Sequence, residues 1–555
     1  MKKFFQFLFA IFLLLSTDSM VAQQYFLHVK SEISSEQSTI TPFQTIDIFP
    51  SIEDANKSYI SIQNQLIKKG YLHLKSQKLE QKNDTLLVGT IHLGQCFEKT
   101  KIYIDKVDPS IKKIANWKAD TLIIATNDFE GFLTNTLQQF DKEGYPMTEI
   151  SIENQTINFP YVEVQLNVKQ DVQRKINQLY TTPYTEFPKN VKKFVERRHK
   201  NKLVSSLSIH QVEQDIFQLS YVKKNRESEV LFTENTTVLY LYSEKKNANQ
   251  FDGLIGFANS EESKKLVFNG YINIQLANTL NAGETLKLHW KNDGNQQSSL
   301  QVETIFPNIA STALGVSSQI HIFKQDSLMQ NTQLGLEVLY SLSTKNYVGL
   351  GIQSQKSTTS TTNSWVTEDY SNLFYTLSHF SSQNSDLELF PVQFSSSFKL
   401  GYGKRTNEIS PTVSQWFVKW KIEKLWQLHP KHFIHQSVET FILQTKQPLY
   451  NEMYRFGGQN SLRGFAQNSM YAQKIVGSYQ EIRQLLSSTM YSFLILDGAV
   501  FNYDDTWKGA FSTGLGIGLE TNGGIFDLSY AIGKRPEEKF SFQNAIFHIG
   551  YKARF

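Results

Sequence analysis

The chain of 555 residues has little cysteine, few long hydrophobic runs and almost no excess of charge of either sign. Its single cysteine, Cys96, excludes an internal disulfide bond. We expect Cys96 to be a small buried side chain beside Phe97, at the end of a strand. The formal net charge of +4, from 56 basic and 52 acidic residues, argues against nucleic acid as a partner.

Long apolar runs are missing except at the start, which argues against a helical membrane protein, because each membrane helix needs about 20 apolar residues. At the start, Lys2 and Lys3 precede an apolar stretch at 4–15, and small or polar residues follow up to Ala22. This order predicts a secretory signal peptide at 1–22, with an uncleaved anchor helix as the alternative. No cysteine lies near the expected cleavage point, so a lipid anchor is disfavoured.

The sequence motifs of common enzymes are also missing. The chain contains no G-x-S-x-G, HExxH, P-loop or CxxC pattern. His429, His432 and His435 are close in sequence, but on a strand His432 and His435 would point to opposite faces, which argues against a metal site. We therefore expect no catalytic residue, no metal, no cofactor and no enzyme activity.

Aromatic residues, in contrast, are abundant in a chain that is polar on average. Aromatics make up 13% of the residues, and the mean hydropathy is −0.35. A transmembrane β-barrel has such a composition, because every second residue of each strand faces a wet interior. A large soluble β protein would have a similar composition, so this observation leaves both classes open.

The N-terminal half, at about 24–245, repeats a helix followed by a two-strand hairpin. The segments 58–94 and 129–168 both show this pattern, with Gly70-Tyr71 and Gly144-Tyr145 directly after the helix. A glycine there ends a helix with a positive φ. A weaker third unit has a strand at 175–182, a helix at 187–207 and a strand at 230–241. The repetition predicts tandem α+β modules at 23–100, 101–172 and 173–246, unless the first two are a coincidence.

A basic stretch at 189–202 lies in the third unit. The simpler interpretation is a solvated helix surface. The alternative is contact with anionic lipid headgroups near the mouth of a barrel.

The C-terminal half, 247–555, consists almost entirely of strands and turns. In the last segment one face holds Ala545, Phe547, Ile549, Tyr551, Ala553 and Phe555. Alternation of this kind predicts either a soluble sandwich or a barrel whose apolar face meets lipid. About sixteen strands can be placed, starting near residues 250, 264, 283, 297, 313, 328, 344, 370, 392, 411, 431, 476, 490, 508, 523 and 543. The signal peptide and the terminal aromatic strand favour a membrane barrel over a soluble sandwich. Such a barrel is expected to be closed, since each unpaired backbone group in hydrocarbon costs about 2–7 kcal/mol.

The segment 448–474, between the eleventh and twelfth predicted strands, contains RFGGQNSLRGF at 455–465. This resembles the sixth-loop signature of the BamA/TamA superfamily of outer-membrane assembly factors, whose core is [V/I/L]RGF. The core here is Leu462, Arg463, Gly464 and Phe465, with Gly457 and Gly458 upstream. The N-terminal units likewise resemble POTRA domains. The resemblance implies α+β periplasmic POTRA-like repeats, followed by an all-β transmembrane barrel of about sixteen antiparallel strands.

The resemblance also implies how the loop is held. In the superfamily the loop folds back into the lumen, and the motif arginine meets acidic residues of nearby strands. Glu481 and Asp497 match by position, and Asp497 is an unexpected charge within an apolar run. A guanidinium suits two carboxylates at once. Whether this contact only fixes the loop or takes part in the working cycle is left open.

A further implication is a weakly paired seam between the first and last strands, here 251–259 and 545–555. Gly550 would weaken the pairing, and Tyr551 and Phe555 would belong to the C-terminal signal. Unfolded outer-membrane or exported proteins would add strands to free edges. The expected location is the bacterial outer membrane, with the N-terminal domains in the periplasm. The expected partners are those clients, the lipid bilayer and a periplasmic or inner-membrane partner protein.

Two other functions remain open. One is a secretion pore of the two-partner type, exporting a cognate protein; that type shares the loop motif but usually has two modules and a plug helix. The other is a porin-like diffusion channel, which would not need the RGF loop.

Overall fold

The structure of the chain is a computed structural model. It describes residues 24–43, 48–259, 266–292, 297–325, 328–359, 368–407, 411–459, 461–503, 506–521, 524–535 and 545–554. The predicted signal peptide at 1–22 lies outside these ranges. The chain forms two compact units, 1–174 with 203–206 and 175–202 with 207–555.

Within the described residues, no helix combines the length and the apolar character needed to cross a membrane.

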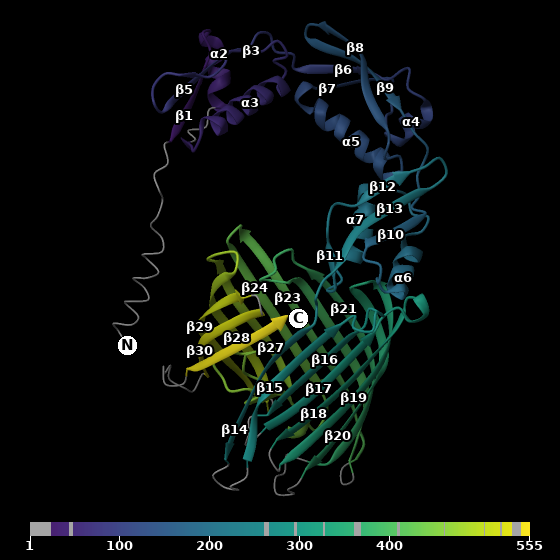
Figure 1. Cartoon of the computed structure of the whole chain (residues 1–555), viewed down its shortest axis with the longest axis vertical. Coiled ribbons are helices and arrows are strands. Elements are labelled where there is room, and N and C mark those ends of the chain that lie inside the picture. Colours follow the sequence, from purple (N-terminus) through teal and green to yellow (C-terminus); the bar gives the residue numbers. More distant parts are fainter. Residues whose placement is uncertain are drawn as a thin grey trace. The chain divides into compact units, whose positions relative to one another are not determined.

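The first module of the first unit packs three helical segments on a small sheet with strand order β2-β1-β5-β3, with β4 also pairing with β5 (Figure 1). Its longest helix begins after Ser51, whose side chain accepts a hydrogen bond from the Asp54 N–H, and it ends before Gly70 at φ +110°. A Cβ at Gly70 would lie 2.2 Å from the carbonyl oxygen of Phe97, so the close approach requires glycine. The elements are β1 (Tyr25–Lys30), α2 (Ser34–Ile40), η1 (Thr41–Phe43), β2 (Ile48–Phe49), α3 (Ile52–Lys68), β3 (Lys75–Ser76), β4 (Glu80–Gln81) and β5 (Leu86–His92).

The second module repeats this plan, with strand order β7-β6-β9-β8. Its long helix also ends before a glycine of positive φ, Gly144 at +82°, as predicted. Cys96, between the two modules, is only half-buried, so the expectation of a buried cysteine is wrong; Phe97 occupies the buried position. The elements are β6 (Lys99–Tyr103), α4 (Pro109–Ile114), β7 (Thr121–Ala125), η2 (Thr126–Asp128), α5 (Phe129–Lys142), β8 (Glu149–Asn158) and β9 (Tyr161–Lys169).

The third module belongs to the second unit, and its sheet has strand order β10-β13-β11, with β12 also pairing with β13. The single helix predicted at 187–207 is wrong, because two helices separated by Asn201 at φ +65° occupy the region. Backbone hydrogen bonds between Ile176 and both Asn201 and Lys202 draw the chain out of the helix. The elements are β10 (Gln178–Pro183), α6 (Lys189–His199), α7 (Ser206–Phe217), β11 (Val222–Lys224), β12 (Glu229–Phe232) and β13 (Thr237–Lys245).

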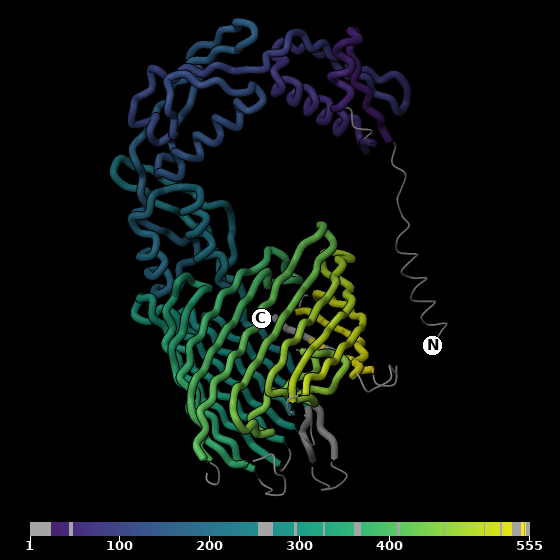
Figure 2. The backbone as a smooth tube through the Cα atoms, turned by 180° about the vertical axis from the view of Figure 1, so that it is seen from behind, coloured from purple at the N-terminus to yellow at the C-terminus, as the bar shows by residue number. Residues whose placement is uncertain are grey.

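In the part of the chain that the structure describes, sixteen antiparallel strands form a closed barrel (Figure 2), which confirms the predicted fold class and the predicted strand starts to within a few residues. The strands are β14 (Gln250–Asn259), β15 (Leu266–Ala277), β16 (Thr285–Asn292), β17 (Gln297–Phe306), β18 (Leu314–Gln325), β19 (Met329–Ser343), β20 (Asn346–Thr359), β21 (Tyr370–Asn384), β22 (Val392–Asn407), β23 (Val413–His429), β24 (His432–Gln444), β27 (Lys474–Leu485), β28 (Met490–Tyr503), β29 (Thr506–Thr521), β30 (Gly524–Lys534) and β31 (Ile546–Arg554).

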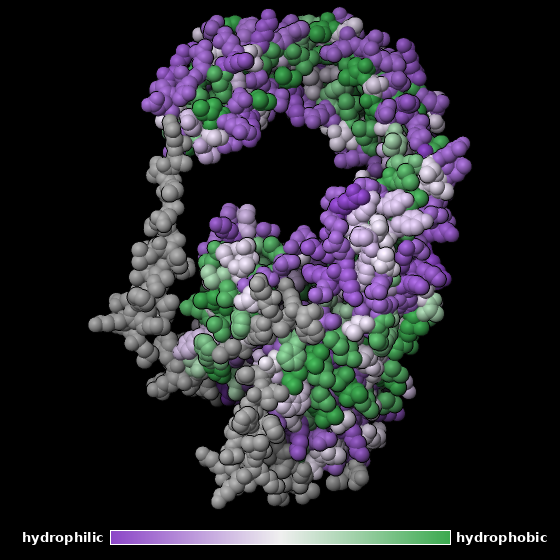
Figure 3. All heavy atoms as spheres, viewed as in Figure 1, coloured by the Kyte–Doolittle hydropathy of each residue, from purple (hydrophilic) through white to green (hydrophobic). Residues whose placement is uncertain are grey.

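The barrel wall is apolar outside and polar inside. On β19, Leu334, Leu336 and Val338 are exposed, whereas Glu337 between them points inward and lies 2.8 Å from Lys399 Nζ. Figure 3 shows hydrophobic residues over the middle of the wall, with hydrophilic residues toward both ends. The two-residue period of each strand thus separates a dry surface from a polar lumen.

The third module is attached to one end of the barrel, which we call the module end. Asn190 Nδ2 donates to the carbonyl of Ala282 at 2.7 Å, and Arg197 Nη1 donates to that of Ser311 at 2.6 Å. Thr344 Oγ1 donates to the carbonyl of Asp215 at 2.7 Å. These contacts involve the turns β15–β16, β17–β18 and β19–β20, which therefore define one rim of the barrel.

The barrel closes through a short seam between its first and last strands. Among the described residues, β14 and β31 pair at two positions, Gln250 with Arg554 and Phe251 with Ala553. On its other side, β14 pairs with β15 along 250–259. Backbone pairing at the seam is thus much shorter than pairing within the wall.

Candidate functional site

The segment between β24 and β27 folds back into the barrel. It contains η4 (Tyr450–Glu452) and a two-stranded ribbon of β25 (Tyr454–Phe456) and β26 (Met470–Ala472). Buried side chains of this loop, such as Phe456 and Met470, form one cluster with wall residues that include Ile475 and Phe501. The loop therefore fills part of the lumen, on the inner faces of β27 to β29.

Two glycines form the turn that presents the motif. Gly457 and Gly458 both have φ +102°, where a glycine fits without strain. The Gly457 N–H donates to Ser461 Oγ at 2.8 Å, and the Gly458 N–H donates to the Leu462 carbonyl at 3.0 Å. The turn is therefore held by its own hydrogen bonds, and Leu462 after it is fully buried.

Gly464 brings the loop against the wall. At φ +76°, a Cβ on Gly464 would lie 2.4 Å from the backbone N of Gly533 in β30. A Cβ on Gly533 would in turn lie 2.4 Å from the ring of Phe465. Two facing glycines and one aromatic ring thus set a contact that any larger residue would disrupt.

Arg463 lies between the two predicted carboxylates and is only 7% exposed. Its Nε donates to Asp497 Oδ2 at 2.8 Å and its Nη2 to Asp497 Oδ1 at 2.7 Å, a two-pronged pairing. Its Nη1 donates to Glu481 Oε1, and its backbone N–H donates to Asp497 Oδ2 at 3.2 Å. The structure therefore brings together all three charged residues singled out by the sequence.

Glu481 is shared with a second arginine. Arg483 Nε and Nη2 lie 2.8 and 2.7 Å from Glu481 Oε2, and the Arg483 guanidinium stacks 4.8 Å from the Phe390 ring centroid. Buried charges must be closely paired, because their desolvation is costly. The arrangement is a fastening for the loop, and it supplies directed hydrogen bonds from the motif to β27 and β28.

A second fastening was not predicted. Arg405 on β22 forms a buried ion pair with Glu452 of η4 and donates to the Gln447 carbonyl at 2.8 Å. Gln415 Nε2 also donates to Glu452 Oε1 at 2.8 Å. The available signal was that Arg405 occupies an inward position in the alternation of its strand, where a cation needs a partner.

Of the predicted residues of the last strand, Gly550 lies beside the loop. Gly550 pairs with Asp527, and a Cβ on Gly550 would lie 2.9 Å from Gln459 Nε2. The backbone of Tyr551 pairs with that of Phe526. Phe555 lies outside the described residues. The motif loop therefore contacts both β30 and β31, the strands that lead to the seam.

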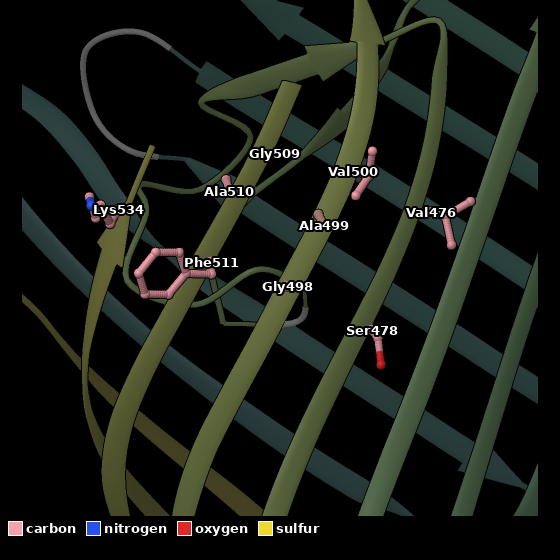
Figure 4. Close-up of a pocket in the computed structure, with 9 residues that line it drawn as sticks. All are labelled: Val476, Ser478, Gly498, Ala499, Val500, Gly509, Ala510, Phe511 and Lys534. Atoms are coloured by element: carbon pink, nitrogen blue, oxygen red, sulfur yellow. The ribbon is translucent and has the colours of Figure 1, made fainter. Parts of the chain in front are cut away.

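A separate hollow lies on the outer face of β27, β28 and β29 and has a volume of about 600 Å³. Figure 4 shows Val476, Val500 and Phe511 on these neighbouring strands. Small residues create the space, among them Ser478, Gly498 and Gly509. Their exposed neighbours Val476 and Phe511 belong to the outer surface, so this hollow is distinct from the lumenal site.

The fold is similar to that of several solved structures. CdiB from Acinetobacter baumannii is 13% identical, has a TM-score of 0.51 and covers 93% of this chain and 98% of its own. CdiB from Escherichia coli is 12% identical, also with a TM-score of 0.51, and covers 90% and 97%. BamA from Haemophilus ducreyi lacking POTRA domains 1–3 is 13% identical, has a TM-score of 0.42 and covers 81% and 98%.

No protein-family model and no curated protein sequence matches the chain. The two CdiB structures share the fold of this chain over most of its length. The predicted fold, α+β modules followed by a barrel of antiparallel strands, is thus confirmed, and at 12–13% identity the likeness concerns the fold alone.

Proposed function

We propose that the protein resides in the bacterial outer membrane, with its modules in the periplasm, and helps other proteins to insert into or cross that membrane. The observation that carries the proposal is the loop held inside a closed barrel by Arg463, Asp497 and Glu481, next to strands that end at a short seam. A simple diffusion channel has no need for a loop that fills part of its lumen and is held to the wall by buried ion pairs.

The outer surface of the barrel supports the membrane location. Exposed apolar side chains occupy successive outward positions, as Leu334, Leu336 and Val338 do on β19. In water such a surface would promote aggregation, whereas in a bilayer these apolar side chains contact the hydrocarbon of the lipids.

The seam supports a mechanism by strand addition. Since β14 and β31 pair at only two positions in the described part of the chain, separating them breaks few hydrogen bonds and frees the edge of β14. An unfolded client can pair with that edge through main-chain hydrogen bonds, which do not depend on its sequence. The loop contacts β30 and β31, so the ion pairs that hold the loop also affect the position of the strands that must move.

The clients in this proposal are unfolded outer-membrane or exported proteins, received from a periplasmic or inner-membrane partner protein. The alternative is a secretion pore for one cognate protein. Three α+β modules support the assembly function, because the secretion type usually has two.

Depletion of the protein, followed by a quantitative census of outer-membrane proteins, tests the proposal. We expect many barrel proteins to decline together, and a plasmid copy to restore them. Loss of one exported protein with an unchanged census would support the secretion pore. An unchanged census together with unchanged export would refute both functions.

A further inference from the structure

The basic stretch at 189–202 is not explained by the proposed function. It forms helix α6 and the turn after it, and it contains seven lysines and arginines but only one acidic residue. Of its cations, Arg197 donates to the Ser311 carbonyl and Arg198 pairs with Asp215 at 3.1 Å. Lys192 and Lys200 instead face a pocket between α6 and the edge strand β10.

This pocket has a volume of about 350 Å³ and a basic lining. Lys192, Arg197 and Lys200 line it together with one carboxylate, Glu196. The Glu196 carboxylate is 4.0 Å from Lys192 Nζ, at the limit of an ion pair, so it neutralises only part of the charge. Tyr180 forms one wall, with Lys192 Nζ 5.5 Å from its ring centroid. The pocket therefore suits a compact anionic group.

Its position relative to the barrel wall indicates where that group comes from. Arg197, which lines the pocket, contacts the turn β17–β18 at the module end. On the two strands of that turn, Phe306 and Leu314 are exposed outward-facing apolar residues. The turn tips carry Leu280, which is 71% exposed, and Ile309, which is 45% exposed. At these two turns, exposed apolar residues continue beyond the end of the wall, which places the headgroup layer of a bilayer at this level.

Figure 1 shows α6 at the edge of the barrel's projection, next to the rim. The pocket lies where the apolar wall gives way to a polar module, within reach of the first polar atoms of a lipid.

We propose that the pocket between β10 and α6 binds the phosphate of an anionic glycerophospholipid in the periplasmic leaflet. Lys192 and Lys200 supply the charge, Arg197 fixes the pocket to the rim, and the acyl chains lie along the wall at Phe306 and Leu314. This inference rests on the proposed membrane location, and it names the lipid class that anchors the third module to the bilayer.

The test measures lipid binding to the full chain in neutral detergent micelles by native mass spectrometry, and needs no export activity. The probes are short-chain phosphatidylglycerol, short-chain phosphatidylcholine and inorganic phosphate. We expect phosphatidylglycerol to bind about tenfold more tightly than phosphatidylcholine, because cations close to a headgroup each strengthen anionic lipid binding severalfold. An excess of inorganic phosphate should not displace it.

Two matched double variants locate the site. Lys192→Gln with Lys200→Gln removes two cations from the pocket, and we expect about tenfold weaker phosphatidylglycerol binding. Lys189→Gln with Lys193→Gln removes two exposed cations of the same helix that do not line the pocket, and binding should stay within about twofold. Lys192→Arg with Lys200→Arg keeps the charge, so it should retain binding, and an unchanged unfolding temperature of each variant in detergent shows that it is folded.

Equal losses in the two glutamine variants would overturn the proposal, because binding would then follow net charge alone. Equal affinity for the two lipids would also overturn it. Displacement by inorganic phosphate at the potency of the lipid would assign the pocket to a free anion instead. If binding is present while depletion leaves the census of outer-membrane proteins unchanged, the lipid site stands and the proposed function fails.

Discussion

Among single residues, Arg463 replaces the water around two buried carboxylates. Its guanidinium satisfies both oxygens of Asp497 and one of Glu481, and Glu481 keeps a second partner in Arg483. Asp497 has no second arginine among the described ion pairs, so its burial depends on Arg463. Removing one member of such a pair leaves a charge in a dry site, which is more damaging than removing both.

Arg463→Ala should therefore destabilise the barrel by about 3–5 kcal/mol and impair assembly of outer-membrane proteins. Thermal unfolding in detergent measures the loss of stability. The census of outer-membrane proteins, in depleted cells that express the variant, measures the loss of assembly. The double variant Arg463→Met with Asp497→Asn separates them, because it leaves no unpaired charge. Restored stability without restored assembly would assign the charges to the working cycle. Restoration of both would mean that they only fix the loop, and wild-type behaviour of Arg463→Ala would refute the assignment of the loop.

Gly464→Ala should displace the motif turn. Its Cβ would meet the backbone of Gly533 at 2.4 Å, and the backbone there has a positive φ, so we expect a loss of about 1–3 kcal/mol. Protease sensitivity of the loop and the unfolding temperature measure the change. Gly498→Ala is the matched control, because no heavy atom lies within 4 Å of a Cβ at that position. Similar effects of the two substitutions would argue against the close contact.

In the first module, Glu36 should make stability depend on pH. Burial raises the pKa of Glu36, but the Ser31 hydroxyl, the N–H groups of Leu93 and Gly94 and the nearby His92 together lower it below the ordinary value. The stabilisation is therefore present above about pH 4.3, the unfolded pKa, and is lost as the pH falls through the lower folded pKa.

Hydrogen exchange of α2 and β5 in the full chain, corrected for intrinsic rates, measures this dependence. Protection should fall on acidification in the wild type and change much less in Glu36→Gln. Parallel curves for the two proteins would contradict the proposed role of the carboxylate.

At the scale of elements, the seam and the loop are connected. The loop contacts β30 through Gly464 and approaches β31 through Gln459, and β31 meets β14 at two positions. Locking those positions tests whether the seam opens.

Phe251→Cys with Ala553→Cys joins register partners across the seam, in a Cys96→Ser background. We expect the oxidised protein to lose assembly activity and to regain it on reduction, because β14 cannot then expose its edge. The control pair Ile274→Cys with Leu288→Cys joins register partners of β15 and β16 within the wall and should be harmless in both states. Full activity of the oxidised seam variant would exclude lateral opening.

The strands of the barrel could be predicted because outward apolar and inward polar residues alternate along each of them. Asp497 could be assigned to the lumen by the same alternation, and this linked it to Arg463. Glu452 could not be assigned, since η4 lies in a segment without alternation and its partner Arg405 is far away in sequence. The division of the helix at Asn201 was missed because it depends on tertiary hydrogen bonds to Ile176.

At the scale of the second unit, one buried carboxylate joins the third module to the rim. Asp215 accepts hydrogen bonds from Arg198 at 3.1 Å and from the fully buried His199 at 2.7 Å. The backbone N–H of Thr344, in the turn β19–β20, is 3.3 Å from the same carboxylate. Asp215 thus stabilises the interior of the third module and also connects this module to the turn β19–β20 of the barrel.

Asp215→Ala should lower stability by about 3 kcal/mol, because Arg198 and His199 lose their common partner. Hydrogen exchange should increase in α7 and in the turn β19–β20 together. Glu227→Ala, which removes an exposed partner of Lys224, should change stability by less than about 1 kcal/mol. An increase confined to α7 would show that the turn does not depend on this carboxylate.

The two buried ion pairs that hold the lumenal loop connect it to different strands, and this determines which part of the loop can move. Arg405 clamps η4 to β22, whereas Arg463 ties the motif to β27 and β28, beside the strands that reach the seam. With Arg463 released and the ion pair of Arg405 intact, η4 would stay on β22, and the part of the loop able to move would be the motif, beside the strands that reach the seam.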